Sequence, residues 1–279
     1  MISNEPHMAH DNELDLLEHY TVQCAVPILL QLDNLGTGLL GTGTFFTVAD
    51  RHFLVTANHN FEDLMEVHKE QLAVPAFHNT EVLHTLGPVV FYAPVDDRLD
   101  VAVIELRDAG LVKQLQRHWR FLTLAHVAAP AQEARDGSIV LAGYPKPPSA
   151  NKNGWTPEGQ VRGRFLFART QRIPTTPNNA DAIVDGRHFF CDYEAAGTLR
   201  DGTVVPSPPL PGVSGASVWE RQPAVEGVWS AEAALRVIGV ENSFIAGHHF
   251  RVTHWSVVAD VLRAISPEIA QAVDAELHL

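Results

Sequence analysis

The sequence predicts an all-β protein built from antiparallel strands, and three observations lead to this fold class. Short segments rich in Val, Ile and Phe recur along the 279 residues, each bounded by Gly, Pro, Asn or Asp. Strands do not alternate regularly with long amphipathic helices, which disfavours a parallel α/β sheet. Hydrophobic residues make up 46% and charged residues 19%, so the chain can bury a sizeable core and is not disordered as a whole.

Seven segments carry the strand pattern, and they fall into two clusters separated by the interval 107–135. Many short strands joined by Gly and Pro turns are typical of antiparallel barrels or of a sandwich. The expected strands, in chain order, are 21–32, 43–49, 51–57, 87–93, 100–106, 137–144 and 236–244.

Helical patterns are few. The segment 61–71 is one candidate, and the stretch 255–276 is the best, because its apolar residues recur at helical spacing on both sides of an interruption at Ser266-Pro267. Three segments are expected to be surface loops, the last because it is too rich in proline for a strand: 145–160, 173–188 and 204–212.

Charge and cysteine content limit which partners and which cellular location are expected. The chain has 33 acidic and 20 basic residues, a formal charge of −13, which disfavours nucleic acid as a partner. It has no run of about 18 apolar residues, so no membrane-spanning helix is expected. The first 20 residues are acidic and do not resemble a secretory signal. Cys24 and Cys191 are too few for a disulfide framework, and together these features indicate a cytoplasmic protein.

Three short segments carry residues with catalytic chemistry. His59 follows the strand-like Val55-Thr56-Ala57, Asp100 opens the apolar run 101–106, and Ser214 stands among small residues at 212–217. A serine hydroxyl is a weak nucleophile that must lose its proton to a base, and histidine, with a pKa of about 6.5, suits that role. A carboxylate can hold the histidine tautomer, and a glycine two positions before the serine lets backbone N–H groups face an anionic oxygen.

These motifs, in the order His, Asp, Ser, resemble those of the trypsin/chymotrypsin-fold serine peptidases, and most those of the bacterial group that includes the glutamyl endopeptidases. The spacings are 41 residues from His59 to Asp100 and 114 from Asp100 to Ser214, and the resemblance runs from residue 36 to 250. The matching pieces are Gly43-Thr44, TANHN at 56–60, LDVAVIEL at 99–106, AGYP at 142–145, GVSGASV at 212–218 and VIGVENS at 237–243.

The resemblance implies two six-stranded antiparallel β-barrels with the active site between them, followed by a C-terminal helix. The implied organisation is an N-terminal extension at 1–19, a first barrel at 20–125, a second barrel at 126–253 and a helical segment at 254–279.

The resemblance also assigns roles. Ser214 is expected to be the nucleophile, His59 the general base and acid, and Asp100 the residue that orients His59. The N–H groups of Gly212 and Ser214 are expected to form the oxyanion hole, whereas Ser217, at the family's usual proline position, is expected to be structural. The chain is thus expected to be a serine endopeptidase that forms an acyl-enzyme and needs no metal or cofactor.

Two other functions stay open at this point. The first is a catalytically silent pseudo-peptidase that binds peptides or a partner protein, and the second is an esterase that uses the same three residues. No obvious pro-segment restrains the expected protease, so a regulatory protein partner is also possible on this interpretation.

Two departures from the family pattern bear on activation and selectivity. Val213 replaces the aspartate that pairs with a new N-terminus in the digestive enzymes, so activation by N-terminal insertion is not expected. Glu241 follows the Val-Ile-Gly-Val run where the glutamyl endopeptidases place a histidine that meets the substrate carboxylate. The substrate-binding candidates are therefore Glu241, Asn242 and Ser243, and Glu241 predicts a preference for Lys or Arg before the scissile bond. If the strand register were shifted by one residue, Glu241 would turn away, and Asn242 or Ser243 would favour small or polar side chains.

Overall fold

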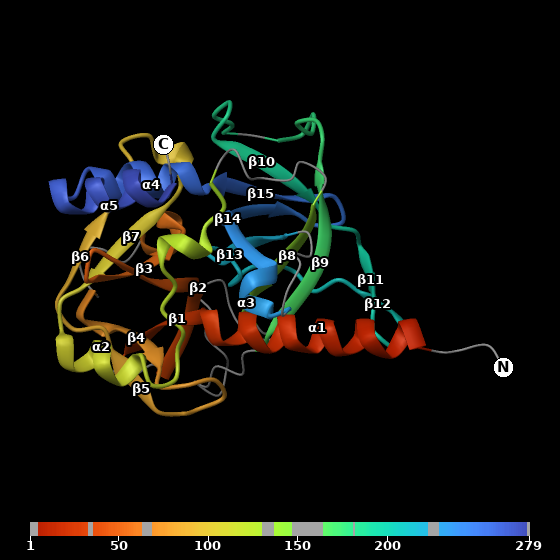
Figure 1. Ribbon diagram of the computed structural model, residues 1–279, viewed down its shortest axis with the longest axis horizontal. Coiled ribbons are helices and arrows are strands. Elements are labelled where there is room, and N and C mark those ends of the chain that lie inside the picture. The colour runs from red at the N-terminus through yellow and green to blue at the C-terminus, as the bar shows by residue number, and fades with distance from the viewer. Residues whose placement is uncertain are drawn as a thin grey trace.

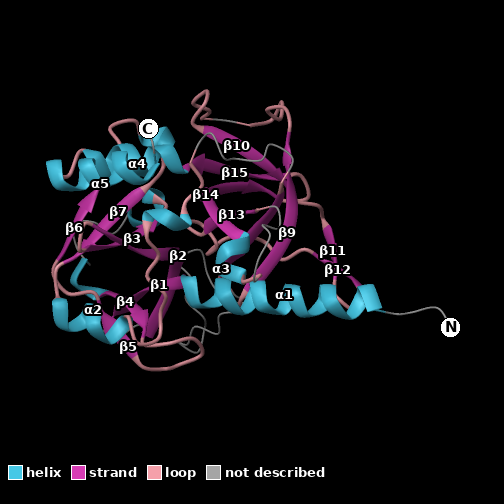
Figure 2. Ribbon diagram, in the orientation of Figure 1, coloured by secondary structure: helices cyan, strands magenta, loops and turns pink. Residues whose placement is uncertain are grey.

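Two antiparallel β-structures lie side by side in the computed structural model, with helices across their faces (Figures 1 and 2). The structure describes residues 5–32, 36–62, 69–129, 137–146, 164–180, 182–222 and 229–277. The predicted loop 145–160 lies almost entirely outside the described residues, as does the middle of the predicted helix 61–71. In the described parts, the all-β class predicted from the sequence is confirmed.

The first β-structure is a seven-stranded sheet, and each of its strands pairs with antiparallel neighbours. Its strands are β1 (Ala25–Leu32), β2 (Gly36–Val48), β3 (Arg51–Thr56), β4 (Leu72–Pro75), β5 (Leu83–Thr85), β6 (Val89–Tyr92) and β7 (Ala102–Leu106). Their order across the sheet is β5-β4-β1-β2-β3-β7-β6. Ala49 and Asp50 both have positive φ, 48° and 60°, which gives the tight hairpin that joins β2 to β3.

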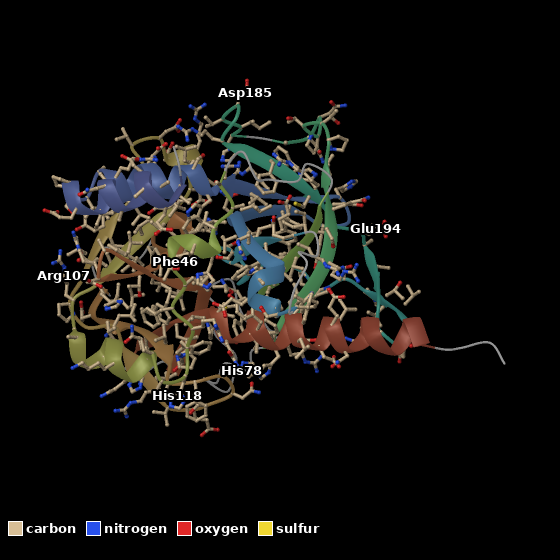
Figure 3. The ribbon with its side chains drawn as sticks, viewed as in Figure 1. Phe46, His78, Arg107, His118, Asp185 and Glu194 are labelled. Carbon is tan, nitrogen blue, oxygen red and sulfur yellow. The ribbon has the colours of Figure 1, made fainter. Side chains whose placement is uncertain are left out.

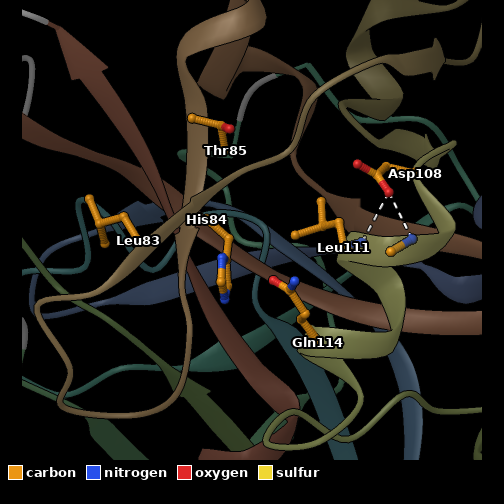
Figure 4. Close-up of a pocket in the computed structure, with 7 residues that line it drawn as sticks. Leu83, His84, Thr85, Asp108, Leu111 and Gln114 are labelled. Carbon is orange, nitrogen blue, oxygen red and sulfur yellow. Dashed lines mark hydrogen bonds between the residues drawn. The ribbon is translucent and has the colours of Figure 1, made fainter.

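This sheet is not closed into the barrel that the resemblance implies, because no ladder joins its edge strands β5 and β6 within the described residues. Helix α2 (Ala109–Leu115) lies beside this opening and packs Leu111, Val112 and Leu115 into the core of the sheet. A covering helix protects a sheet edge without strand pairing. A hollow of about 330 Å³ remains between β5 and α2, where Asp108 caps the helix through the N–H groups of Gly110 and Leu111 (Figure 4).

The second β-structure is a closed six-stranded barrel with the order β10-β15-β14-β13-β8-β9. Its strands are β8 (Ser138–Gly143), β9 (Leu166–Ile173), β10 (His188–Asp192), β13 (Ser217–Arg221), β14 (Leu235–Ile245) and β15 (His249–His254). A small hairpin of β11 (Ala196–Thr198) and β12 (Val204–Pro206) stands outside it. The expectation of no strand at 204–212 is therefore wrong for three residues, because Pro206 ends a two-stranded ribbon, where proline is tolerated.

Helices occupy both ends of the chain: α1 (Glu5–Cys24) at the start, and α4 (Trp255–Arg263) and α5 (Pro267–Leu277) at the end. The one-turn α3 (Ala231–Ala234) directly precedes β14. The predicted strand 21–32 begins too early, since α1 continues through Cys24 and β1 starts at Ala25. The proline at 267 separates α4 from α5, as the sequence predicts. Of the predicted helix 61–71, the described ends are short 3₁₀ turns, η1 (Asn58–Phe61) and η2 (Lys69–Gln71).

A shared core fixes the sheet against the barrel. Phe46 of β2 packs against Trp255 at the start of α4, with the rings tilted by 38° and their centroids 4.5 Å apart, and Figure 3 shows Phe46 in the interior. Tyr20 of α1 meets Trp219 of β13 edge-on at 5.9 Å. Large aromatic side chains dominate the apolar area that such contacts bury. The two β-structures are therefore held in one arrangement, and so are the loops between them.

None of the described helices is both long enough and apolar enough to cross a membrane.

Candidate functional site

His59 and Asp100 lie at adjacent strand ends of the first sheet. β3 and β7 are neighbours, with Thr56 opposite Ala102, so the loops that leave β3 and enter β7 meet at one edge. His59 stands in η1, just after β3, and Asp100 lies between β7 and the 3₁₀ turn η3 (Asp97–Leu99). The sheet register thus places two residues 41 positions apart in contact.

The Asp100 carboxylate holds His59 with both oxygens. Its Oδ2 lies 2.7 Å from His59 Nδ1, and its Oδ1 accepts the backbone N–H of His59 at 2.9 Å. The Asp100 side chain is 11% exposed, while the His59 side chain is 37% exposed. A buried carboxylate therefore fixes the ring of a histidine whose other side faces solvent.

Ser214 lies in a tight loop that requires glycine at two positions. Gly212 and Gly215 have φ of 92° and 94°, which is the left-handed region. A Cβ at Gly215 would lie 2.0 Å from Thr56 Oγ1, and one at Gly212 would lie 2.7 Å from the Tyr144 carbonyl oxygen. No side chain fits at either position, so the glycines set the path of the chain on both sides of Ser214.

The Ser214 carbonyl oxygen connects this loop to the first sheet by hydrogen bonds. That oxygen accepts the N–H of Thr42 at 2.9 Å and Nδ2 of Asn60 at 3.0 Å. Asn60 follows His59 directly, so Ser214 is anchored to the same turn that carries the histidine. The described residues show no hydrogen bond between the half-buried Ser214 hydroxyl and the His59 ring. In ligand-free sites such contacts are often long and tighten on substrate binding.

Two backbone N–H groups at this loop have no acceptor in the described part of the chain: those of Gly212 and Ser214. The amides around them are engaged, since Val213 donates to the Leu210 carbonyl at 2.7 Å and Gly215 donates to that of Glu241 at 2.7 Å. Amides without an internal acceptor are available to stabilise an anionic oxygen.

Ser217 is placed as the structural serine that the sequence indicates. Its side chain is buried, and its Oγ donates to Thr44 Oγ1 at 2.9 Å across the boundary between the barrel and the first sheet. The Ser217 hydroxyl is thus engaged in a buried hydrogen bond, whereas the Ser214 hydroxyl makes none within the described residues.

Glu241 is fully buried beside the Ser214 loop. Its N–H donates to the Ala216 carbonyl at 2.9 Å, and its own carbonyl accepts from Gly215. The side chain has no exposed area, and neither carboxylate oxygen has a hydrogen-bond partner among the described residues. Burial raises its pKa to about 8; Asp100 acts in the same direction and Arg251 acts against it. The carboxyl is therefore mostly uncharged at neutral pH.

The two residues after Glu241 differ in accessibility. The Asn242 side chain is buried, and its amide lies between Arg251 and Thr253 of β15, with hydrogen bonds of 2.9 and 2.6 Å. Ser243 is half-buried. Sequence reasoning identified neither Asn60 nor Thr253 as part of this site. Asn60 stands inside the TANHN motif, but its contact partner is 154 residues away, which no local pattern reveals.

In comparisons with known proteins, no protein-family model matches the chain, and no curated protein matches it significantly.

Proposed function

We propose that the protein is a serine endopeptidase of the trypsin/chymotrypsin fold type, with Ser214, His59 and Asp100 as its catalytic triad. The observation that carries the proposal is the His59–Asp100 contact of 2.7 Å next to a turn whose Asn60 anchors Ser214. A closed antiparallel barrel packed on an antiparallel sheet is compatible with that fold type.

In the proposed reaction, Ser214 Oγ attacks the carbonyl carbon of the scissile bond while His59 takes the hydroxyl proton. Asp100 keeps the other ring nitrogen of His59 protonated and stabilises the imidazolium. The N–H groups of Gly212 and Ser214 bind the negatively charged oxygen, a contribution of about 3–4 kcal/mol where a single donor has been removed elsewhere. His59 then gives its proton to the leaving amine, and water attacks the acyl-enzyme with His59 again as base.

Covalent labelling by a fluorophosphonate separates this proposal from the catalytically silent alternative, because only an activated serine reacts. Matched peptide and ester substrates separate an endopeptidase from an esterase.

The buried thiols of Cys24 and Cys191 are free, which suits the cytoplasmic location that the sequence indicates.

We expect the site to form without proteolytic maturation. The Val213 side chain is buried in the barrel core and offers no carboxylate to a new N-terminus. A tag fused ahead of Met1 should therefore leave fluorophosphonate labelling of the full-length chain within about twofold, since no step of the proposed chemistry uses the terminus. Labelling that appears only after cleavage near β1 would refute this expectation.

We expect substrate selectivity to depend on Glu241. The Glu241 side chain is fully buried, so it would act through its charge beside the Ser214 loop: as an anion it would attract a Lys or Arg side chain before the scissile bond and disfavour an acidic one. Because the Glu241 pKa is raised to about 8, the carboxyl is neutral below that pH and charged above it. The preference for Lys and Arg should therefore increase between pH 7 and pH 9.

Profiling on a peptide library at both pH values tests this expectation. Glu241→Gln should lose the preference and its pH dependence, while Glu276→Gln, the same change on the exposed face of α5, should keep both. A preference for Glu or Asp, or an unchanged profile in Glu241→Gln, would exclude Glu241 as the residue that selects the substrate.

A further inference from the structure

A buried chain of hydrogen bonds runs from the barrel to the residue that precedes Asp100. Arg251 Nε donates to Asn242 Oδ1 at 2.9 Å, and Asn242 Nδ2 donates to Thr253 Oγ1 at 2.6 Å. Thr253 Oγ1 donates to the Leu99 carbonyl oxygen at 2.7 Å. Thr253 is fully buried, and Asn242 and Arg251 are 3% and 7% exposed, so water does not compete for these bonds.

The direction of this chain follows from the chemistry of its first member. An arginine side chain can only donate hydrogen bonds, so Arg251 requires the oxygen of the Asn242 amide and turns its NH₂ group toward Thr253. The Thr253 oxygen accepts from that NH₂ group, and its own hydrogen is then directed to the Leu99 carbonyl. Each of the three bonds thus joins a donor to an acceptor, and a connected buried network of this kind stabilises one arrangement.

The chain of hydrogen bonds ends beside a residue with an uncommon backbone conformation. Asp100 has a φ of 47°, in the left-handed region, which residues other than glycine rarely adopt and which aspartate tolerates better than most. On its N-terminal side, the turn is closed by the N–H of Asp100 on the Asp97 carbonyl at 3.1 Å. Thr253 holds the same turn from the barrel side, through the carbonyl of the peptide whose N–H belongs to Asp100.

We propose that Thr253, with Asn242 and Arg251 behind it, is a positioning residue for Asp100. By holding the Leu99–Asp100 peptide, it sets the direction in which the Asp100 carboxylate meets His59. The catalytic consequence rests on the proposed function, whereas the orientation of His59 by Asp100 is measurable without any substrate.

These hydrogen bonds are not needed merely to hold the two β-structures together. Two other hydrogen bonds join the sheet to the barrel, Ser217 to Thr44 and Asn60 to Ser214. The contact of Phe46 with Trp255 also fixes α4 on the sheet. Loss of the Thr253 hydroxyl should therefore disturb one turn and leave the fold in place.

Thr253→Val tests the proposal, because it keeps the side-chain shape and removes the hydroxyl. We expect the fluorophosphonate labelling rate of Ser214 to fall by about tenfold to a hundredfold, the range in which a small misplacement of a reacting group acts. The Nδ1–H proton resonance of His59, assigned by its absence from His59→Gln, should shift or broaden. Thr253→Ser, which restores the hydroxyl, should recover the rate to within about threefold.

The matched control is Thr21→Val, another fully buried threonine, whose hydroxyl donates to the Glu18 carbonyl within α1. It should lose similar stability and keep both the labelling rate and the His59 resonance. Equal labelling rates and an unmoved His59 resonance in folded Thr253→Val would overturn the proposal, even if that variant melts at a lower temperature.

Asn242→Asp serves if Thr253→Val does not fold. Its carboxylate can accept from both Arg251 and the Thr253 hydroxyl, which turns the hydroxyl hydrogen away from Leu99 while the ion pair with Arg251 supports the fold. We expect slower labelling with an unchanged or higher melting temperature, and full-rate labelling would again overturn the proposal. A wild-type protein that no fluorophosphonate labels would refute the proposed function, and the His59 resonance in the Thr253 variants would then decide the positioning role alone.

Discussion

Ser214→Ala should abolish fluorophosphonate labelling and reduce peptide hydrolysis by a factor on the order of 10⁶, with the fold retained. His59→Ala should reduce hydrolysis by a similar factor, because the nucleophile and its base act as one unit. The change at Ser214 removes a half-buried hydroxyl with no internal hydrogen-bond partner among the described residues, so it leaves no buried group unpaired. The Ser214 carbonyl, which Thr42 and Asn60 hold, is untouched by the substitution.

Steady-state hydrolysis of a peptide substrate and mass spectrometry of the labelled protein measure the two effects. Ser217→Ala is the matched control, a serine three residues away with a buried hydroxyl bonded to Thr44. It should lower the melting temperature and keep labelling. If Ser214→Ala cleaved peptides at the wild-type rate, the assignment of Ser214, His59 and Asp100 as the catalytic triad would be refuted. If only Ser217→Ala lost labelling, Ser217 would be the nucleophile.

Asp100→Asn should slow hydrolysis by about 10⁴-fold through the wrong tautomer of His59. In the structure, Oδ1 of Asp100 accepts the backbone N–H of His59, a donor that cannot become an acceptor. Asparagine at this position must therefore keep its oxygen there and turn its NH₂ group to His59 Nδ1. That nitrogen becomes an acceptor, the ring proton moves to Nε2, and the histidine can no longer take the serine proton.

Rate measurements on peptide substrates and the ¹⁵N shifts of the His59 ring check this expectation together. Asp97→Asn, an exposed aspartate three residues earlier on η3, is the control and should change neither. An active Asp100→Asn variant whose His59 carries its proton on Nε2 would show that His59 is not the base. An active variant that keeps the proton on Nδ1 would show that another group orients the histidine.

Local sequence patterns were sufficient for several strands and for the motifs of the candidate site. Strands β2, β3, β6, β7, β8 and β14 fall within or overlap the apolar segments that the sequence marks, because β-branched and aromatic residues favour a pleated surface. The break between α4 and α5 follows from one proline. The glycines at 212 and 215 are visible in the sequence, and the structure supplies the contacts that require them.

Other strands gave no such signal. β9 mixes arginine, threonine and glutamine with apolar residues and is half-buried along most of its length, so no clear pattern marks it. β15 is buried with His249, Arg251 and Thr253 in it, polar residues that an apolar pattern treats as surface. These two strands are stabilised by pairing in the closed barrel and not by an apolar side-chain pattern, since their backbone groups bond to neighbouring strands.

The sequence by itself determined which residues could carry the chemistry: a histidine after a strand, an aspartate before one and a serine between glycines, in a fixed order. Only the tertiary structure decided which of them meet and how. Three features depend on segments far apart in the chain: the open first sheet, the burial of Glu241 with no hydrogen-bond partner among the described residues, and the hydrogen bond from Thr253 to Leu99. Secondary-structure propensity depends on neighbours along the chain. These features instead arise from packing and hydrogen bonds between residues up to 154 positions apart. The entropic cost of bringing such residues together is offset only when the whole fold has formed.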